Sequence, residues 1–79
     1  MSENIATLIR TERSKRGWSI REAASHLDTG FGHLCNIENR DHVNLTASTL
    51  VRIKDVFGLS RRRVWNAVEQ SLLEGRRHG

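Results

Sequence analysis

Apolar residues recur at three- and four-residue intervals along most of this chain, the spacing that places them on one face of a helix. No stretch alternates between apolar and polar residues with period two, so we expect no sheet. Turn-forming residues interrupt the helical pattern at RGWS, LDTG, NRDHVN, FGLS and EGRRHG, and they divide the chain into five segments. Five short helices joined by short turns predict a compact all-α bundle.

The first two predicted helices carry recognisable caps. Ser2 is placed to cap the first helix, which ends at Gly17. Ser19 is placed to cap the second, and Glu22 at its third helical position completes a capping box. The apolar faces consist of Ile5, Leu8 and Ile9 in the first helix and of Ile20, Ala23, Ala24 and Leu27 in the second.

The other three predicted helices follow the same rules. The third runs from about Gly30 to Asn39. The fourth follows a Thr46 cap and ends at Gly58, and the fifth spans 60–74 with Ser60 as its cap. The expected core faces are Phe31, Leu34, Cys35 and Ile37, then Leu50, Ile53, Val56 and Phe57, then Val64 and Val68.

Seventy-nine residues leave room for one core. We place the domain at 1–74 and expect 75–79 to be a basic flexible tail. Cys35 is the only cysteine and the histidines lack ligand spacing, so we expect no disulfide, no metal site and no cofactor. No apolar run is long enough to cross a membrane and no signal peptide is recognisable, so a cytoplasmic protein is expected.

The charge balance is compatible with an anionic partner. The formal net charge is +4, and Lys15 and Lys54 are the only lysines among thirteen cationic residues. Arginine is the better bidentate ligand for phosphate and for base edges. A GC-rich genome would give the same bias towards arginine, so both explanations stay open.

The second and third predicted helices are separated only by DTG, a spacing typical of helix-turn-helix DNA-binding units and also found in enzymes and adaptors. Residues 5–59 resemble the phage-repressor and Cro type of helix-turn-helix domain, also called the xenobiotic-response-element family. The matching motifs are RGWSIREAASHL, HLCNIEN and LTASTLVRIKDVFGLS. The resemblance implies a lambda-repressor-like bundle in which helices two and three form the helix-turn-helix.

The chain departs from the family pattern at several positions. Ile20 stands where the family has a glutamine that touches DNA, and Leu45 stands where a proline is usual. Asp28 replaces the usual turn glycine, and it can adopt a left-handed conformation at modest cost. Glu12 occupies a position of the first helix that is normally apolar.

The resemblance implies that the exposed side of the third helix reads bases. The residues at the reading positions are Phe31, Gly32, Cys35, Asn36 and Asn39. Asn36 is the best direct reader because asparagine can bond bidentately to adenine. Phe31 is placed to press on thymine methyl groups, with a core position under helix two as the alternative. Cys35 is expected to be a small apolar filler rather than a reactive thiol.

Polar residues that flank this helix are the expected ligands of the DNA backbone, with a solvated surface as the alternative. They are Arg21, Gly30, His33, Arg40, His42, Asn44, Thr46 and Ser48. The arginine and glutamate that pair in the family correspond to Arg13 and Glu38. We expect this salt bridge to hold helix three against helix one and to make no DNA contact.

The run Arg61, Arg62 and Arg63 opposes the dipole at its helix N-terminus, at a cost of about 0.3–1 kcal/mol per charge. An anionic partner, DNA backbone or an acidic patch on another subunit would explain the run, and a solvated helix end is the alternative. The apolar set of the fifth helix is too wide for one core face. Its remaining large residues, Trp65, Leu72 and Leu73, are therefore the expected dimer contact.

The function expected from these residues is a sequence-specific transcriptional regulator. It would be a repressor or autoregulator from a phage, plasmid or small bacterial operon, binding the major groove of double-stranded DNA as a homodimer. One alternative is an antitoxin, which would bind a toxin as well as its operator. Another is a DNA-architectural or excision factor, which depends more on DNA shape than on base contacts. No catalytic constellation is recognisable, so we expect no enzyme.

Overall fold

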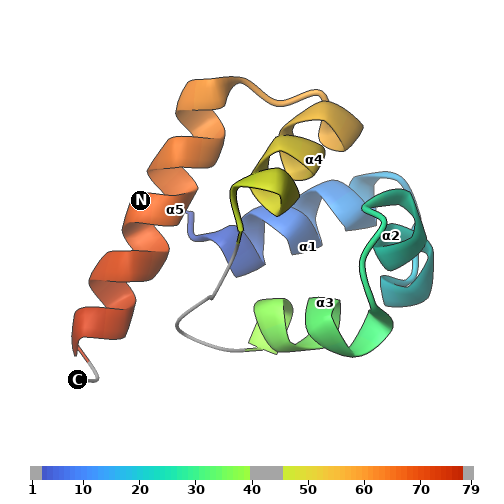
Figure 1. The fold of residues 1–79 in the computed structure, drawn as a ribbon, viewed down its shortest axis with the longest axis horizontal. Coiled ribbons are helices and arrows are strands. Elements are labelled where there is room, and N and C mark those ends of the chain that lie inside the picture. Colours follow the sequence, from blue (N-terminus) through green and yellow to red (C-terminus); the bar gives the residue numbers. More distant parts are fainter. Residues whose placement is uncertain (1–2, 40–45, 78–79) are drawn as a thin grey trace.

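Five α-helices follow one another in the computed structural model, which describes the backbone of residues 3–39 and 46–77 and the side chains of residues 3–38 and 46–73 (Figure 1). They are α1 (Ile5–Lys15), α2 (Ile20–His26), α3 (Phe31–Asn39), α4 (Ala47–Phe57) and α5 (Arg61–Arg77). The described residues contain no strand. The expected all-α architecture of five helices in one globule is confirmed for this part of the chain.

The caps explain why most helices begin where they do. The Ser19 hydroxyl accepts a hydrogen bond from the Glu22 amide, and the Glu22 carboxylate accepts one from the Ser19 amide. Thr46 caps α4 and Ser60 caps α5 through the hydroxyl alone, which accepts from the Thr49 amide and the Arg63 amide respectively. The cap of α1 differs from the expected one, because Asn4 directly precedes the helix and accepts from the Thr7 amide at 2.8 Å. Ser2 lies outside the described residues.

Three of the helices end in the same hydrogen-bonded turn. After α1, α2 and α4 the chain passes through a left-handed residue, namely Gly17 (φ 68°), Asp28 (φ 53°) and Gly58 (φ 63°). After α2 the Thr29 amide reaches back to the Ala24 carbonyl and the Asp28 amide to the Ser25 carbonyl. The left-handed conformation anticipated for Asp28 is therefore present. The fifth helix continues to Arg77, past the residue 74 at which we expected it to end, so residues 75–77 are helical.

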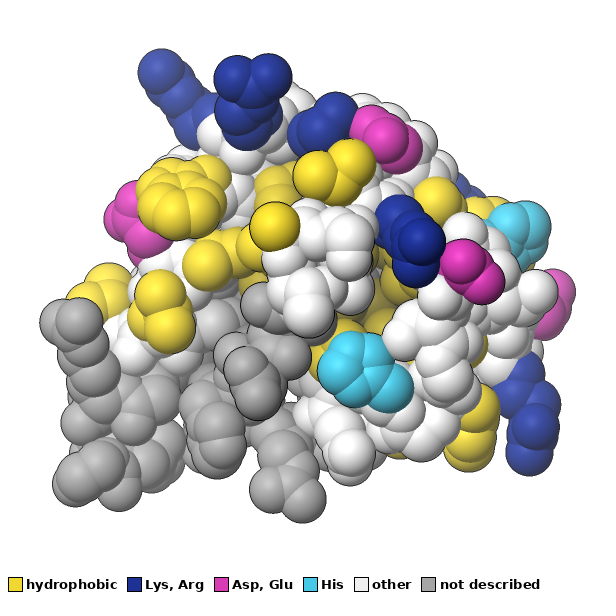
Figure 2. Space-filling model, in the orientation of Figure 1, with side chains coloured by type: hydrophobic (Ala, Val, Ile, Leu, Met, Phe, Trp, Pro, Cys, Tyr) yellow, Lys and Arg dark blue, Asp and Glu magenta, His cyan; other side chains and the backbone are white. Residues whose placement is uncertain are grey.

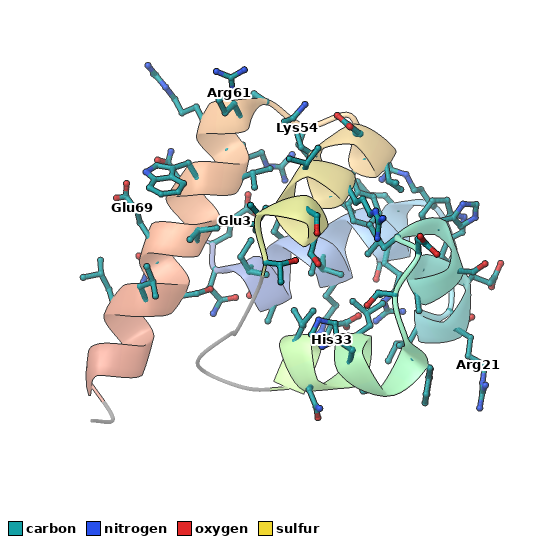
Figure 3. All side chains as sticks on the ribbon, in the orientation of Figure 1. Glu3, Arg21, His33, Lys54, Arg61 and Glu69 are labelled. Carbon is teal, nitrogen blue, oxygen red and sulfur yellow. The ribbon has the colours of Figure 1, made fainter. Side chains whose placement is uncertain are left out.

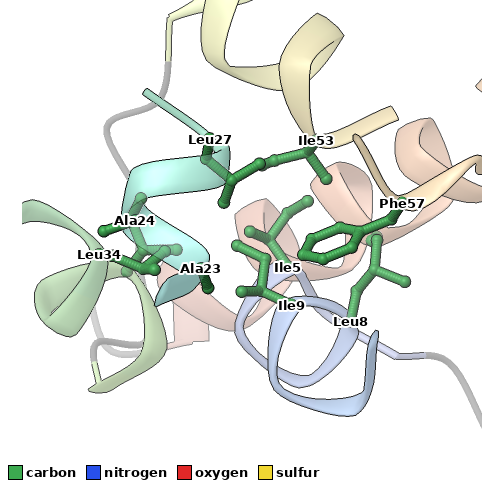
Figure 4. Close-up of a cluster of buried hydrophobic side chains, with 11 residues drawn as sticks. Ile5, Leu8, Ile9, Ala23, Ala24, Leu27, Leu34, Ile53 and Phe57 are labelled. Atoms are coloured by element: carbon green, nitrogen blue, oxygen red, sulfur yellow. The ribbon is translucent and has the colours of Figure 1, made fainter. Parts of the chain in front are cut away.

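The core lies where α1 meets the other helices (Figure 4). Helix α1 packs against α3 and α5, α2 packs against α3, and α4 packs against α5. The buried cluster consists of Ile5, Leu8, Ile9, Ala23, Ala24, Leu27, Leu34, Ile37, Ile53, Phe57 and Ala67. The buried Ser71 hydroxyl accepts a hydrogen bond from the Ile5 amide at 2.9 Å, which joins the start of α1 to α5.

Two residues expected on the buried face of α3 are not fully buried. Phe31 is 42% exposed, and its ring lies beneath the guanidinium of Arg21 at 4.4 Å instead of entering the core. Cys35 is only partly buried. Leu34 and Ile37 are the buried apolar residues in the described part of this short helix. Among the described residues, no helix combines the length and the apolar character needed to cross a bilayer.

Candidate nucleic-acid interface

The turn between α2 and α3 is held from two sides. Its backbone is fixed by the left-handed Asp28 and the hydrogen bonds that close α2. Arg52 on α4 donates to the Asp28 carbonyl at 3.2 Å and lies 3.4 Å from its carboxylate. Both side chains are exposed, so this ion pair contributes little to stability by itself. It nevertheless connects the turn to α4, and the spacing of residues in the sequence did not reveal this contact.

The inner side of α3 is anchored by an ion pair that joins it to α1. Arg13 donates from Nε to one Glu38 oxygen at 3.2 Å and from Nη2 to the other at 3.1 Å. The Glu38 side chain is only 2% exposed, so these two charge-assisted hydrogen bonds offset the cost of removing its carboxylate from water. Arg13 and Glu38, expected to pair, thus do so in the structure.

Arg10 is a further partner of Glu38 that the sequence reading missed. It donates to the Glu38 backbone carbonyl at 2.8 Å, and its Nε lies 3.6 Å from the carboxylate. Arg10 precedes Arg13 by three residues and therefore lies on the same side of α1. This spacing is the signal that would have identified it. Glu38 is consequently held through both its side chain and its backbone, which fixes the C-terminal half of α3.

The outer side of α3 is open to solvent (Figure 3). Of the predicted base readers, Phe31, Gly32 and Asn36 are exposed and Cys35 is partly buried. The side chain of Asn39 lies outside the described residues. Helix α3 contains no Lys or Arg, so its outer surface offers an amide, a ring and bare backbone rather than positive charge.

Arg21, a predicted phosphate ligand, contacts Phe31, a predicted base reader. The guanidinium carbon lies 4.4 Å from the ring centroid, within the range of a cation–π interaction. Both residues are exposed. Arg21 therefore supports the ring at the beginning of α3 while its charge remains accessible.

The other predicted ligands of the DNA backbone that the structure describes lie at α3 and at the start of α4. Gly30 and His33 are exposed beside or on α3, and a Cβ on Gly30 would meet nothing within 4 Å. Thr46 and Ser48 are exposed at the start of α4 and share a hydrogen bond of 3.1 Å. Arg40, His42 and Asn44 lie outside the described residues.

Glu12, which replaces an apolar residue, is a buried carboxylate with three cationic partners. Its residue is only 4% exposed, and it accepts hydrogen bonds from Lys15 at 3.1 Å, Arg16 at 3.0 Å and Arg63 at 3.1 Å. Burial by itself raises the pKa of this carboxyl. Hydrogen bonds from Arg16 and Lys15, together with the charges of Lys15 and Arg63, outweigh burial and hold the pKa below its ordinary value of 4.5.

The arginine run at the start of α5 contains one member of this network, Arg63. Arg63 also donates to Glu3 at 2.8 Å, and this hydrogen bond raises the pKa of Arg63, although burial opposes the shift. Arg63 therefore connects α1 and the residues before it to α5. Arg61 and Arg62 are exposed. Among the described residues, contacts inside the protein explain Arg63 but not Arg61 or Arg62.

The predicted dimer residues lie on the open side of α5. Trp65 is 57% exposed, Leu72 is 56% exposed and Leu73 is 51% exposed. In the face shown in Figure 2, hydrophobic side chains gather over α4 and α5, with Lys and Arg side chains along one end. Large apolar side chains left open on one helix are typical of a contact with another molecule.

The described part of α3 therefore presents hydrogen-bonding and apolar groups to solvent on its outer side. The groups that keep it rigid lie on the opposite side, in Leu34, Ile37 and Glu38. No protein family, curated protein or solved structure matches this chain.

Proposed function

We propose that this chain is a sequence-specific DNA-binding transcriptional regulator that acts by binding and not by catalysis. In this proposal α2 and α3 form a lambda-repressor-like helix-turn-helix, and α3 enters the major groove of double-stranded DNA. The observation that carries the proposal is the division of α3 into two sides. Leu34 and Ile37 are buried and Glu38 is paired, whereas Phe31 and Asn36 face solvent.

Each exposed group of α3 has a role that fits DNA. The Asn36 amide can donate to adenine N7 and accept from adenine N6, a pattern that discriminates adenine from the other bases. Gly30 and Gly32 leave open space where a side chain would stand, which permits close approach to a base edge or a phosphate. Arg21 supplies positive charge at the edge of this surface.

We also propose that the regulator acts as a homodimer, a repressor or autoregulator of its own small operon in the cytoplasm. Helix-turn-helix dimers bind half-sites about one helical turn apart, roughly 34–36 Å. The exposed apolar residues of α5 support the dimer, since no described part of the chain covers them. In this proposal protein concentration controls occupancy of the DNA.

Asn36→Ala tests this function. A preferred duplex is first selected from a random-sequence pool, and the affinities of the wild-type protein for this duplex and for random DNA are measured at several salt concentrations. We expect Asn36→Ala to reduce discrimination by about 1–3 kcal/mol. Asn66→Ala is the matched control, because Asn66 is an exposed asparagine on α5. Equal wild-type affinity for selected and random DNA at every salt concentration would contradict a specific regulator.

A DNA-architectural or excision factor is a second candidate function. The absence of Lys and Arg from α3 favours it, because such factors rely on DNA shape and apolar wedges more than on charged base contacts. An exposed Phe31 suits this role as well. The same titration distinguishes the two functions, since an architectural factor would bend DNA while showing little preference between the selected and the random duplex.

A further inference from the structure

An apolar groove lies between α4 and α5. It has a volume of about 280 Å³ and is lined by Leu50, Val51, Lys54, Arg61, Val64 and Trp65. Val51 is 51% exposed and Trp65 is 57% exposed, so both sides of the groove present large apolar surfaces to solvent. A volume below the roughly 300–1,000 Å³ of small-molecule sites fits individual side chains of a peptide better than a whole cofactor.

The groove is bordered by positive charge. Lys54 contributes from α4, where its ammonium also pairs with the Asp55 carboxylate at 2.8 Å. Arg61, for which the described residues show no ion pair, contributes from the first residue of α5 (Figure 3). Arg63 in the same run has internal partners in Glu3 and Glu12, whereas Arg61 is exposed at the groove. The first turn of α5 contains no acidic residue, so its dipole and Arg61 act together in favour of an external carboxylate.

We propose that this groove binds an acidic amphipathic segment of a partner protein. Large apolar side chains of the segment occupy the space between Val51 and Trp65, and its Asp or Glu residues lie against Lys54 and Arg61. This arrangement corresponds to the recognition of an amphipathic helix by a hydrophobic groove with complementary charge at its rim. It also explains Arg61 in a run of arginines that opposes the helix dipole.

DNA and a second copy of the chain fit the groove less well. A phosphate backbone offers nothing to the apolar floor, and in Figure 3 Arg61 and Lys54 lie at the opposite end of the molecule from Arg21 and His33. A two-fold axis through the groove would set Lys54 and Arg61 against the same cations of the other copy. Leu72 and Leu73 lie about two turns further along α5 and remain open for a dimer.

The test uses two synthetic peptides and the whole 79-residue chain. One peptide is a short amphipathic helix with Leu and Phe along one side and Glu on both flanks, and the other has every Glu replaced by Lys. Fluorescence anisotropy should show the acidic peptide binding about tenfold more tightly or better. Trp65→Ala and Arg61→Glu should each weaken its binding by about tenfold.

Matched controls lie beside these residues in the chain. Arg62→Glu makes the same charge change one position away, and Asn66→Ala truncates an exposed side chain of α5 that does not line the groove. Both should leave peptide binding within about twofold of the wild-type value. Val51→Glu provides a second groove variant on α4, and circular dichroism establishes that each variant is folded.

Four results would overturn the proposal. The first is equal binding of the two peptides, and the second is an equal effect of Arg61→Glu and Arg62→Glu on peptide affinity. The third is a Trp65→Ala variant that loses a dimer while keeping its peptide affinity. The fourth is an Arg61→Glu variant that binds duplex DNA more weakly but keeps its affinity for the peptide. The third would assign the surface to a second copy and the fourth to DNA. DNA binding by wild-type protein is measured separately, so failure of the groove and failure of the proposed regulator function are distinguishable.

Discussion

Phe31 is a residue for which the sequence left two positions open, an exposed base reader and a core residue under α2. Its spacing from Leu34 fits a core face, yet its ring is 42% exposed and lies under Arg21 at 4.4 Å. The two residues are ten positions apart and belong to different helices, so periodicity within one helix could not reveal their contact. A ring held in this way at the start of α3 presents an apolar edge to whatever α3 binds.

If α3 reads DNA, this edge should detect the 5-methyl group of thymine. Replacing single thymines of the selected duplex by deoxyuridine removes only that methyl group. We expect a loss of about fourfold at one position, corresponding to about 0.8 kcal/mol for one buried CH₂-sized group. In Phe31→Ala the thymine and deoxyuridine duplexes should bind equally, and anisotropy titrations measure both.

Arg21→Gln serves as the comparison, because it removes the cation above the ring and leaves Phe31 in place. It should weaken binding to all duplexes through the lost phosphate contact, and it should reduce the methyl preference only in part. A wild-type protein that binds every deoxyuridine duplex as tightly as the thymine duplex would exclude the methyl contact. Specific DNA binding could still hold in that case.

At the scale of single helices, the sequence predicts the caps and helix ends, because their hydrogen bonds lie within one helix and its flanking residues. The capping box of Ser19 and Glu22 and the stop at Gly58 were recognisable because their bonds span a few residues. Contacts between helices were not recognisable in this way. A carboxylate at the normally apolar position of Glu12 is unexpected from the sequence, because its partner Arg63 lies 51 positions further along the chain.

The Glu12 network yields a prediction about stability. Glu12→Gln keeps the shape but removes the charge, and we expect it to lower the free energy of unfolding by about 1–3 kcal/mol. Glu12→Leu should stay within about 1 kcal/mol of wild type, because its cationic partners can turn to solvent and an apolar side chain suits this buried site. Urea unfolding at neutral pH measures both, and a Leu variant less stable than the Gln variant would contradict this explanation.

The sign of the pH dependence follows from the lowered pKa of Glu12. A carboxyl whose pKa is lower in the folded state stabilises the fold above its unfolded pKa of about 4.5. That stabilisation is lost as the pH falls through the lower, folded-state pKa. The wild-type protein should therefore lose stability over this acid range more steeply than Glu12→Gln. Parallel curves for the two proteins would show that Glu12 is not responsible.

At the scale of the whole molecule, side chains from different helices form surfaces that the sequence does not show. The number of helices and most core residues could be predicted, since burial follows the apolar spacing. The sequence could not show that Trp65 borders a groove with α4 while Leu72 and Leu73 stand further along the same helix. Exposure depends on which neighbours cover a helix, and those neighbours are distant in the chain.

The arrangement of α3 and α5 supports a dimer formed through Leu72 and Leu73. In Figure 1 the C-terminal end of α5 lies at the same side of the molecule as α3. Two copies that meet at this end would turn their α3 helices towards the same DNA face.

Leu73→Asp should therefore weaken the dimer by placing a charge in an apolar contact, with little effect on folding because Leu73 is 51% exposed. Sedimentation should show a shift towards monomer. Binding to a duplex with two half-sites should fall by about tenfold or more, whereas binding to one half-site should change little, because each α3 is intact. Asn66→Asp introduces the same charge at an exposed polar position of α5 and should leave both measurements unchanged. A Leu73→Asp protein that keeps the wild-type oligomeric state and the wild-type preference for two half-sites would place the dimer contact elsewhere.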